Sequence, residues 1–113
     1  MESPVNLEIR NNIAILEICN PPVNALSLSV RKYLMKSLLK AEQDNSVSAI
    51  IIVGHGKTFS AGADITEFGN PPMSPILPII CNQIEKSEKP VICSMHGTVL
   101  GGGLEMALAC HYR

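Results

Sequence analysis

Two short turns built from small residues are the places in this sequence where the backbone could do chemistry. One is Ser60–Asp64 and the other is Gly101–Glu105, and each follows an apolar segment typical of a buried parallel strand. Ligands bind at the carboxyl ends of such strands, and small residues let a ligand approach the backbone closely. The free N–H groups of the two turns, one of them at a helix start, could therefore hold a developing negative oxygen together.

Glu105 is the candidate general base beside that oxygen. The residues from Leu104 to Cys110 are strong helix formers, so the sequence predicts Glu105 in the first turn of a helix, where the helix dipole favours an ionised carboxylate. Such a carboxylate can accept or deliver a proton. The same residues also allow a plainer interpretation, in which the three glycines form a close-packed turn and Glu105 is an exposed surface acid. The residues alone leave both interpretations open.

Two better-known motifs fail on their spacing. Gly56-Lys57-Thr58 resembles the end of a phosphate-binding loop, but Ile51 stands where that loop requires its first glycine. The nucleophile-elbow pattern fails around Ser60, because Thr58 occupies its first glycine position. The three histidines show no metal-ligand spacing, so the sequence predicts no metal site.

The elements that must position the two turns follow from the hydrophobic pattern. The predicted strands span 5–10, 13–18, 49–53 and 90–95, and the predicted helices span 28–43, 76–86 and 104–110. This order predicts an α/β fold. Asn11-Asn12 predicts a tight turn between the first two strands, and Ser27 predicts an N-cap for the first helix.

The same pattern predicts which side chains are buried. In the helix over 28–43, one face is expected in the core and another in solvent; the core face carries Val30, Leu34, Leu38 and Ala41, and the solvent face carries Arg31, Lys32, Lys36 and Lys40. Met95, Met106 and the leucines and isoleucines are expected in the core. Prolines predict a stiff extended loop over 20–25, an interruption of the second helix at Pro78, and a mobile connection over 69–75.

Composition excludes several classes of function. Nine basic and ten acidic residues leave a net charge of -1, which does not suit a nucleic-acid-binding surface. The longest apolar run, Ala49 to Val53, is too short to span a bilayer, and the first ten residues lack the pattern of a signal peptide. No Cys-x-x-Cys pair occurs among the four cysteines, so we expect reduced thiols rather than disulfides.

Three motifs together resemble the crotonase (enoyl-CoA hydratase/isomerase) superfamily. They are NPPVNAL at 20–26, FSAGADI at 59–65 and GGGLE at 101–105, in the right order and spacing. The resemblance covers the whole chain but only the front part of a crotonase domain. It implies a crotonase-like α/β fold of repeated ββα units, incomplete here, with residues 1–113 as the N-terminal part of one domain. Residues 109–113 look most like the peroxisomal multifunctional members of the family.

The resemblance also implies roles for individual residues. The backbone N–H groups of Ala63 and Gly102 would form the oxyanion hole for a thioester carbonyl. Glu105 matches the first of two catalytic glutamates, which helps bind and activate the water that adds to the 2-enoyl double bond. The other implied contacts are with the substrate: Val23, Ala25 and Leu26 along the pantetheine arm, Ala61 at the adenine end, Asp64 holding its loop, Ile65 at the acyl chain, and Gly101 in the glycine turn.

The implied function is reversible hydration of trans-2-enoyl-CoA to 3-hydroxyacyl-CoA in fatty-acid β-oxidation. Two carboxylates share that work in the family, and the second glutamate would follow the next strand, beyond Arg113. Glu105 favours hydration over simple isomerisation, because members that only isomerise the double bond often lack a glutamate there. Δ3-Δ2-enoyl-CoA isomerisation and an inactive acyl-CoA-binding chain stay open as alternatives.

The resemblance finally implies what the protein works with and where. No cofactor is expected, because the CoA arrives with the acyl-CoA substrate, and neither a nucleic acid nor a membrane is expected as a partner. A stand-alone hydratase would form a homo-trimer, whereas part of a multifunctional enzyme could be monomeric. The expected location is the peroxisome, or otherwise the mitochondrion or cytoplasm, and not the outside of the cell.

Overall fold

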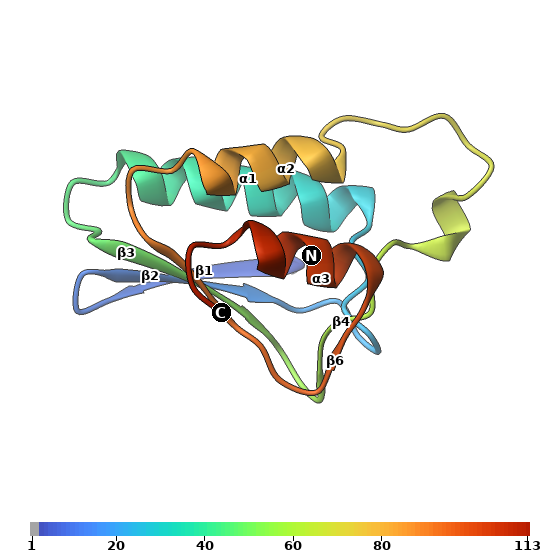
Figure 1. The fold of residues 1–113 in the computed structure, drawn as a ribbon, viewed down its shortest axis with the longest axis horizontal. Coiled ribbons are helices and arrows are strands. Elements are labelled where there is room, and N and C mark those ends of the chain that lie inside the picture. Colours follow the sequence, from blue (N-terminus) through green and yellow to red (C-terminus); the bar gives the residue numbers. More distant parts are fainter. Residues whose placement is uncertain (1–2) are drawn as a thin grey trace.

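A computed structural model describes residues 3–113, which form a mixed α/β structure as predicted (Figure 1). The strands are β1 (Val5–Arg10), β2 (Ile13–Ile18), β3 (Ala49–Gly54), β4 (Thr58–Ser60), β5 (Val91–Ser94) and β6 (Thr98–Val99). The helices are α1 (Leu28–Gln43), the short 3-10 helix η1 (Ile65–Glu67), α2 (Leu77–Glu85) and α3 (Gly101–Ala109).

The main sheet has the strand order β1-β2-β3-β5. The β1–β2 pair is antiparallel, and the other two pairs are parallel. Asn11 and Asn12 join β1 to β2 with φ angles of 51° and 66°, which confirms the predicted tight turn. Alternate residues of β2 and β3 are buried, and α1 packs over β1 and β2 with α2 beside it (Figure 1). Buried side chains on alternate positions of the sheet therefore hold it against the helices.

The start of α1 also agrees with the sequence. The Ser27 hydroxyl accepts a hydrogen bond from the Val30 N–H at 3.2 Å, so Ser27 is the N-cap. Val30, Leu34 and Leu38 are completely buried, as expected of the core face. Arg31 contradicts the expectation of a solvent-facing basic row, because only 9% of its surface is exposed. Its buried contacts are described below.

A second, small sheet pairs β4 with β6 in parallel, and the sequence did not predict it. Strands of two or three residues are too short to show a periodic pattern. The Ser60–Asp64 and Gly101–Glu105 turns follow β4 and β6 rather than the long buried strands. The prediction that each turn follows a buried apolar strand of the main sheet is thus wrong, although β4 and β6 are themselves parallel to each other.

Three proline and helix-boundary expectations need correction. Residues 21–24 form a turn, not an extended stretch, and Asn24 has a φ of 52°. Pro78 lies in the first turn of α2, where a missing N–H costs no hydrogen bond, so it does not interrupt the helix. Helix α3 begins at Gly101, three residues earlier than predicted, so Glu105 lies in its second turn, where the dipole argument is weaker.

Several apolar side chains expected in the core are instead exposed. Met95 follows the end of β5 and is 40% exposed, whereas Met106 is fully buried as predicted. Leu100, Leu104 and Leu108 form an exposed stripe along α3. No helix within residues 3–113 combines the length and apolar character required to cross a membrane.

Candidate functional site

The two predicted turns touch through their backbones. A Cβ atom built on Gly62 would lie 3.1 Å from the Gly102 nitrogen, and one built on Gly102 would lie 3.9 Å from the Ala63 nitrogen. The contact is closest at Gly103, where an added Cβ would lie 2.5 Å from the Ser60 carbonyl oxygen. Glycine is needed at this position because any side chain would push the turns apart.

Two N–H groups at this contact are free to bind a ligand. Gly62 N–H donates to the Ser60 hydroxyl, and Gly103 N–H donates to the Leu100 carbonyl. Between residues 3 and 113, no hydrogen-bond acceptor is found for the N–H of Ala63 or of Gly102. Gly102 is the second residue of α3, where the helix itself supplies no acceptor. Both N–H groups therefore lie without an acceptor at the place where the two turns meet.

Asn24 holds the first turn in place, a role that sequence reasoning missed. Its side-chain NH2 donates to the carbonyl oxygens of His55 at 3.0 Å and Thr58 at 2.7 Å, and its Oδ1 accepts from the Asn20 N–H at 2.8 Å. The Ser60 hydroxyl, also fully buried, donates to the Asn24 carbonyl at 2.8 Å. An asparagine between apolar residues in a proline-rich loop was the available signal, because Asn tolerates a positive φ and satisfies buried backbone groups.

The loop around Asn24 runs beside the first turn. Ala61 N–H donates to the Val23 carbonyl at 2.9 Å, and Leu26 N–H donates to the Gly62 carbonyl at 2.8 Å. These two bonds bring together the residues that the resemblance assigned to the CoA arm. Val23 is 41% exposed, Ala25 is half-buried and Leu26 is buried.

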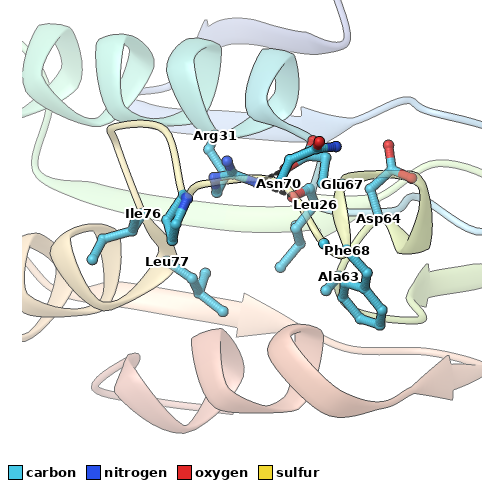
Figure 2. A pocket seen from close by; sticks show the side chains of 11 residues that line it. Leu26, Arg31, Ala63, Asp64, Glu67, Phe68, Asn70, Ile76 and Leu77 are labelled. Atoms are coloured by element: carbon cyan, nitrogen blue, oxygen red, sulfur yellow. Dashed lines mark hydrogen bonds and ion pairs between the residues drawn. The ribbon is translucent and has the colours of Figure 1, made fainter.

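A pocket of about 360 Å³ opens beside Ala63 (Figure 2). Its lining includes Leu26, Ala63, Asp64, Phe68, Ile76 and Leu77. Leu26 and Leu77 also contact the glycine turn, since a Cβ atom on Gly102 would lie 3.4 Å and 2.8 Å from their respective side chains. The free N–H groups and the largely apolar pocket are therefore neighbours.

Glu105 is exposed and does not belong to the lining of this pocket. It lies close enough to α2 to affect Cys81. Burial raises the pKa of the Cys81 thiol to about 11, and the Glu105 carboxylate adds to that rise. The geometry therefore places Glu105 on the same helix as Gly102, one turn further on, near the α2–α3 contact.

The remaining predicted residues lie in or next to the two turns. Asp64 accepts hydrogen bonds from the N–H and the hydroxyl of Thr66, at 2.9 and 2.7 Å, which is the loop-holding contact expected of it. These bonds lower the pKa of the Asp64 carboxyl below its ordinary value. Ile65 is 75% exposed, and Gly101 is exposed with a φ of 51°.

The cysteines and the other possible metal ligands within residues 3–113 form no second candidate site. Cys19 and Cys81 are half-buried, Cys93 and Cys110 are buried, and all four are free thiols. Across the described chain, residues 3–113, no three histidine, cysteine or acidic side chains gather as metal ligands would.

Comparison with known proteins finds the same family along almost the whole chain. The family model described as enoyl-CoA hydratase/isomerase matches residues 8–113. The peroxisomal bifunctional enzyme of Danio rerio is 44% identical over 105 residues, which is 93% of this chain but 15% of that protein. A probable enoyl-CoA hydratase of Bacillus subtilis is also 44% identical, over 96% of this chain and 45% of that protein.

Solved structures agree with the sequence relatives. An enoyl-CoA hydratase from Thermoplasma volcanium superposes with a TM-score of 0.87 at 32% identity, and 97% of this chain covers 47% of that one. A structure from Legionella pneumophila, described as a possible enoyl-CoA hydratase/isomerase (crotonase), gives a TM-score of 0.89 at 28% identity, with 96% of this chain covering 46% of that one. The chain thus spans less than half the length of these proteins. It has the crotonase fold and belongs to the enoyl-CoA hydratase/isomerase family.

Proposed function

We propose that this chain binds the thioester carbonyl of a trans-2-enoyl-CoA and takes part in its reversible hydration to a 3-hydroxyacyl-CoA. The observation that supports this most directly is the pair of free N–H groups on Ala63 and Gly102 beside an apolar pocket. Addition of water to the double bond puts negative charge on the thioester oxygen. Two donors aimed at that oxygen stabilise the enolate, and each can contribute about 3 kcal/mol.

The surroundings of the two donors suit the rest of such a substrate. The pocket beside Ala63 would take the acyl chain, with Ile65 at its edge. The loop carrying Val23 and Ala25 would line the pantetheine arm, and Ala61 would lie towards the adenine end. The CoA moiety comes with the substrate, so the proposal needs no separate cofactor.

Glu105 is proposed as one of the two carboxylates that hydration requires. It is exposed, so water can reach it, and it stands one helical turn from Gly102. In this role its carboxylate would orient and deprotonate the water that attacks Cβ. The second carboxylate would deliver the proton to Cα.

The cellular setting is proposed from the relatives. Several are named as peroxisomal enzymes, including a multifunctional protein of fatty-acid β-oxidation from Arabidopsis thaliana that is 39% identical over 96% of this chain. Peroxisomal β-oxidation is therefore the proposed setting. Light scattering distinguishes the trimer of a stand-alone hydratase from the monomer of a multifunctional enzyme.

Substitution of Glu105 tests the proposal. The longest polypeptide in which this chain occurs is incubated with a trans-2-enoyl-CoA, and loss of the conjugated absorbance is followed together with formation of 3-hydroxyacyl-CoA. Glu105→Gln should lower kcat by about a hundredfold or more, since it removes a general base without changing shape. Glu85→Gln is the matched control, because Glu85 is an exposed carboxylate on α2 that also contributes to the raised pKa of Cys81.

Other outcomes identify the alternatives. If Glu105→Gln hydrates at the parent rate, the proposed role of Glu105 is wrong. Conversion of a 3-enoyl-CoA to the 2-enoyl-CoA without hydration would make the protein an isomerase. Saturable CoA-ester binding with no product of either kind would identify an acyl-CoA-binding protein instead.

A further inference from the structure

Arg31 is the charged residue of α1 that the structure buries, and its contacts are unusual for a helix position. Its Nε donates to the Pro75 carbonyl at 2.7 Å, and its Nη1 donates to the Leu26 carbonyl at 2.7 Å. A longer bond, at 3.4 Å, joins its Nη2 to the Met73 carbonyl. The guanidinium thus joins the backbone of the loop before α1 to the backbone of the segment before α2, a geometry that its planar array of five donors suits.

Glu67 completes this arrangement. Its Oε1 lies 3.1 Å from Nη1 of Arg31, and its Oε2 accepts from the Leu28 N–H at 2.8 Å, in the first turn of α1. The carboxylate therefore neutralises the buried guanidinium and also satisfies a backbone donor that the helix leaves free. Figure 2 shows Arg31 reaching from α1 towards Glu67 and the Leu26 backbone, beside the pocket.

The segment that this ion pair holds is otherwise weakly anchored. Residues 65–76 comprise η1 and its connection to α2, and they project away from the rest of the chain (Figure 1). The composition of residues 69–75 within this segment predicts a mobile connection, and Phe68 and Met73 are 68% and 59% exposed. Phe68 and Ile76 line the pocket, so the position of this segment determines the shape of one pocket wall.

We propose that Arg31 and Glu67 are positioning residues that hold residues 65–76 as a wall of the pocket and thereby determine how well long acyl chains bind. The proposal rests on the proposed function for its choice of ligand. It assigns the pair to the wall rather than to the thioester end, because that end has its own supports. Two bonds that do not include the Arg31 side chain hold that turn, the Leu26 N–H to Gly62 carbonyl bond and the Ser60–Asn24 bond.

The first experiment measures amide hydrogen exchange and needs no activity. Arg31→Met removes all the donors, and Arg31→Lys, which keeps the charge, serves if the first variant does not fold. Arg10→Met is the matched control, because Arg10 also pairs with a glutamate, Glu8, but both side chains are more than half exposed. Amides of residues 65–76 should exchange about tenfold faster or more in Arg31→Met, less so in Arg31→Lys, and unchanged in Arg10→Met.

The second experiment compares a short and a long substrate in the longest polypeptide that contains the chain. With trans-2-decenoyl-CoA, Arg31→Met should raise KM about tenfold with kcat little changed, because the wall contacts the chain and not the reacting atoms. With crotonyl-CoA, whose four-carbon chain we expect to end short of the wall, both constants should stay within about twofold of the parent. Glu67→Gln keeps an acceptor for the Leu28 N–H, so its KM for trans-2-decenoyl-CoA should lie between the values for the parent and for Arg31→Met.

The results that overturn the proposal are distinct from those that overturn the proposed function. Unchanged exchange over 65–76 would show that the ion pair does not hold the segment. Equal loss of kcat for both substrates would place its effect at the thioester end or in the fold as a whole. A parent protein that turns over neither substrate would refute the proposed function and the chain-length role with it, while the exchange result would still decide whether the pair holds the wall.

Discussion

The main sheet with α1 and the pair of turns after β4 and β6 are stabilised by different means. In the sheet region, contact is made by large side chains such as Leu16, Leu34 and Ile52, all fully buried. In the turn region, contact is made by backbone atoms, and the closest approach is between Gly103 and Ser60. The sheet should therefore respond to changes of side-chain volume, whereas the turns should respond to the addition of a single carbon.

The largest loss of stability should come from a cavity in the sheet region. Leu34→Ala removes a fully buried side chain between α1 and the sheet, and should lower the free energy of unfolding by about 3 kcal/mol. Urea denaturation measures this, with Leu39→Ala as the control because Leu39 lies on the same helix and is 38% exposed. Affinity for a CoA ester should be unchanged in the protein that remains folded; a matching loss of affinity would contradict the division between the two regions.

A smaller loss of stability with a larger loss of binding is expected in the turns. Gly103→Ala places a Cβ atom 2.5 Å from the Ser60 carbonyl oxygen, so the two turns must separate, at a cost of about 2 kcal/mol. CoA-ester binding, followed by calorimetry, should fall about a hundredfold, because separated turns cannot present the Ala63 and Gly102 donors to one atom as the proposed function requires. Gly56→Ala controls for glycine replacement, since its Cβ meets nothing within 4 Å although its φ is +83°. Equal effects of the two alanines would exclude steric separation as the cause.

The smallest effect concerns two aspartates with the same local contacts. Asp64 in the turn region bonds to Thr66, and Asp44 at the end of α1 bonds to Ser46 in the same way. In each case the side-chain and backbone hydrogen bonds lower the carboxyl pKa below its ordinary 3.8. Each carboxylate therefore stabilises the fold above pH 3.8, and that contribution disappears as the pH falls through the lowered pKa.

Asp64→Asn and Asp44→Asn should thus be slightly less stable than the parent at pH 7 and approach it at more acidic pH. Thermal unfolding between pH 7 and pH 2 measures the difference. Only Asp64→Asn should also weaken CoA-ester binding, because only Asp64 lies in the lining of the pocket. Weaker binding in both variants would mean that the effect is electrostatic and not local.

The difference between regions held by side chains and regions held by backbone contacts also explains what the sequence could predict. The β1–β2 hairpin and the core face of α1 follow from side-chain periodicity and from two asparagines, and all were confirmed. The β4–β6 pair was not predicted, because strands this short show no alternation of apolar and polar residues. Their pairing also depends on residues that are far apart in the chain. Arg31 was misassigned for a related reason: its burial depends on the Met73 and Pro75 carbonyls, which no pattern within α1 reveals.

The candidate site was predictable to a similar degree. The motifs predicted that the two turns act together, and the structure does bring them into contact, but the motifs did not show which neighbours support them. Asn24 and Ser60 are buried and bonded only because the loops cross, so their roles needed the fold. The assignments of Ala63, Gly102 and Glu105 remain predictions until the experiments above are done.

The pairing of β4 with β6 has a consequence for the order in which the chain folds. The contact between the Gly56 carbonyl and the His96 ring, at the edge of this pair, joins residues 40 positions apart. Closing so long a loop costs entropy that two short strands repay poorly, so we expect β3, α2 and β5 to form first. The Ala63 and Gly102 N–H groups would then come together late in folding, and until that point the first turn would be exposed without its counterpart.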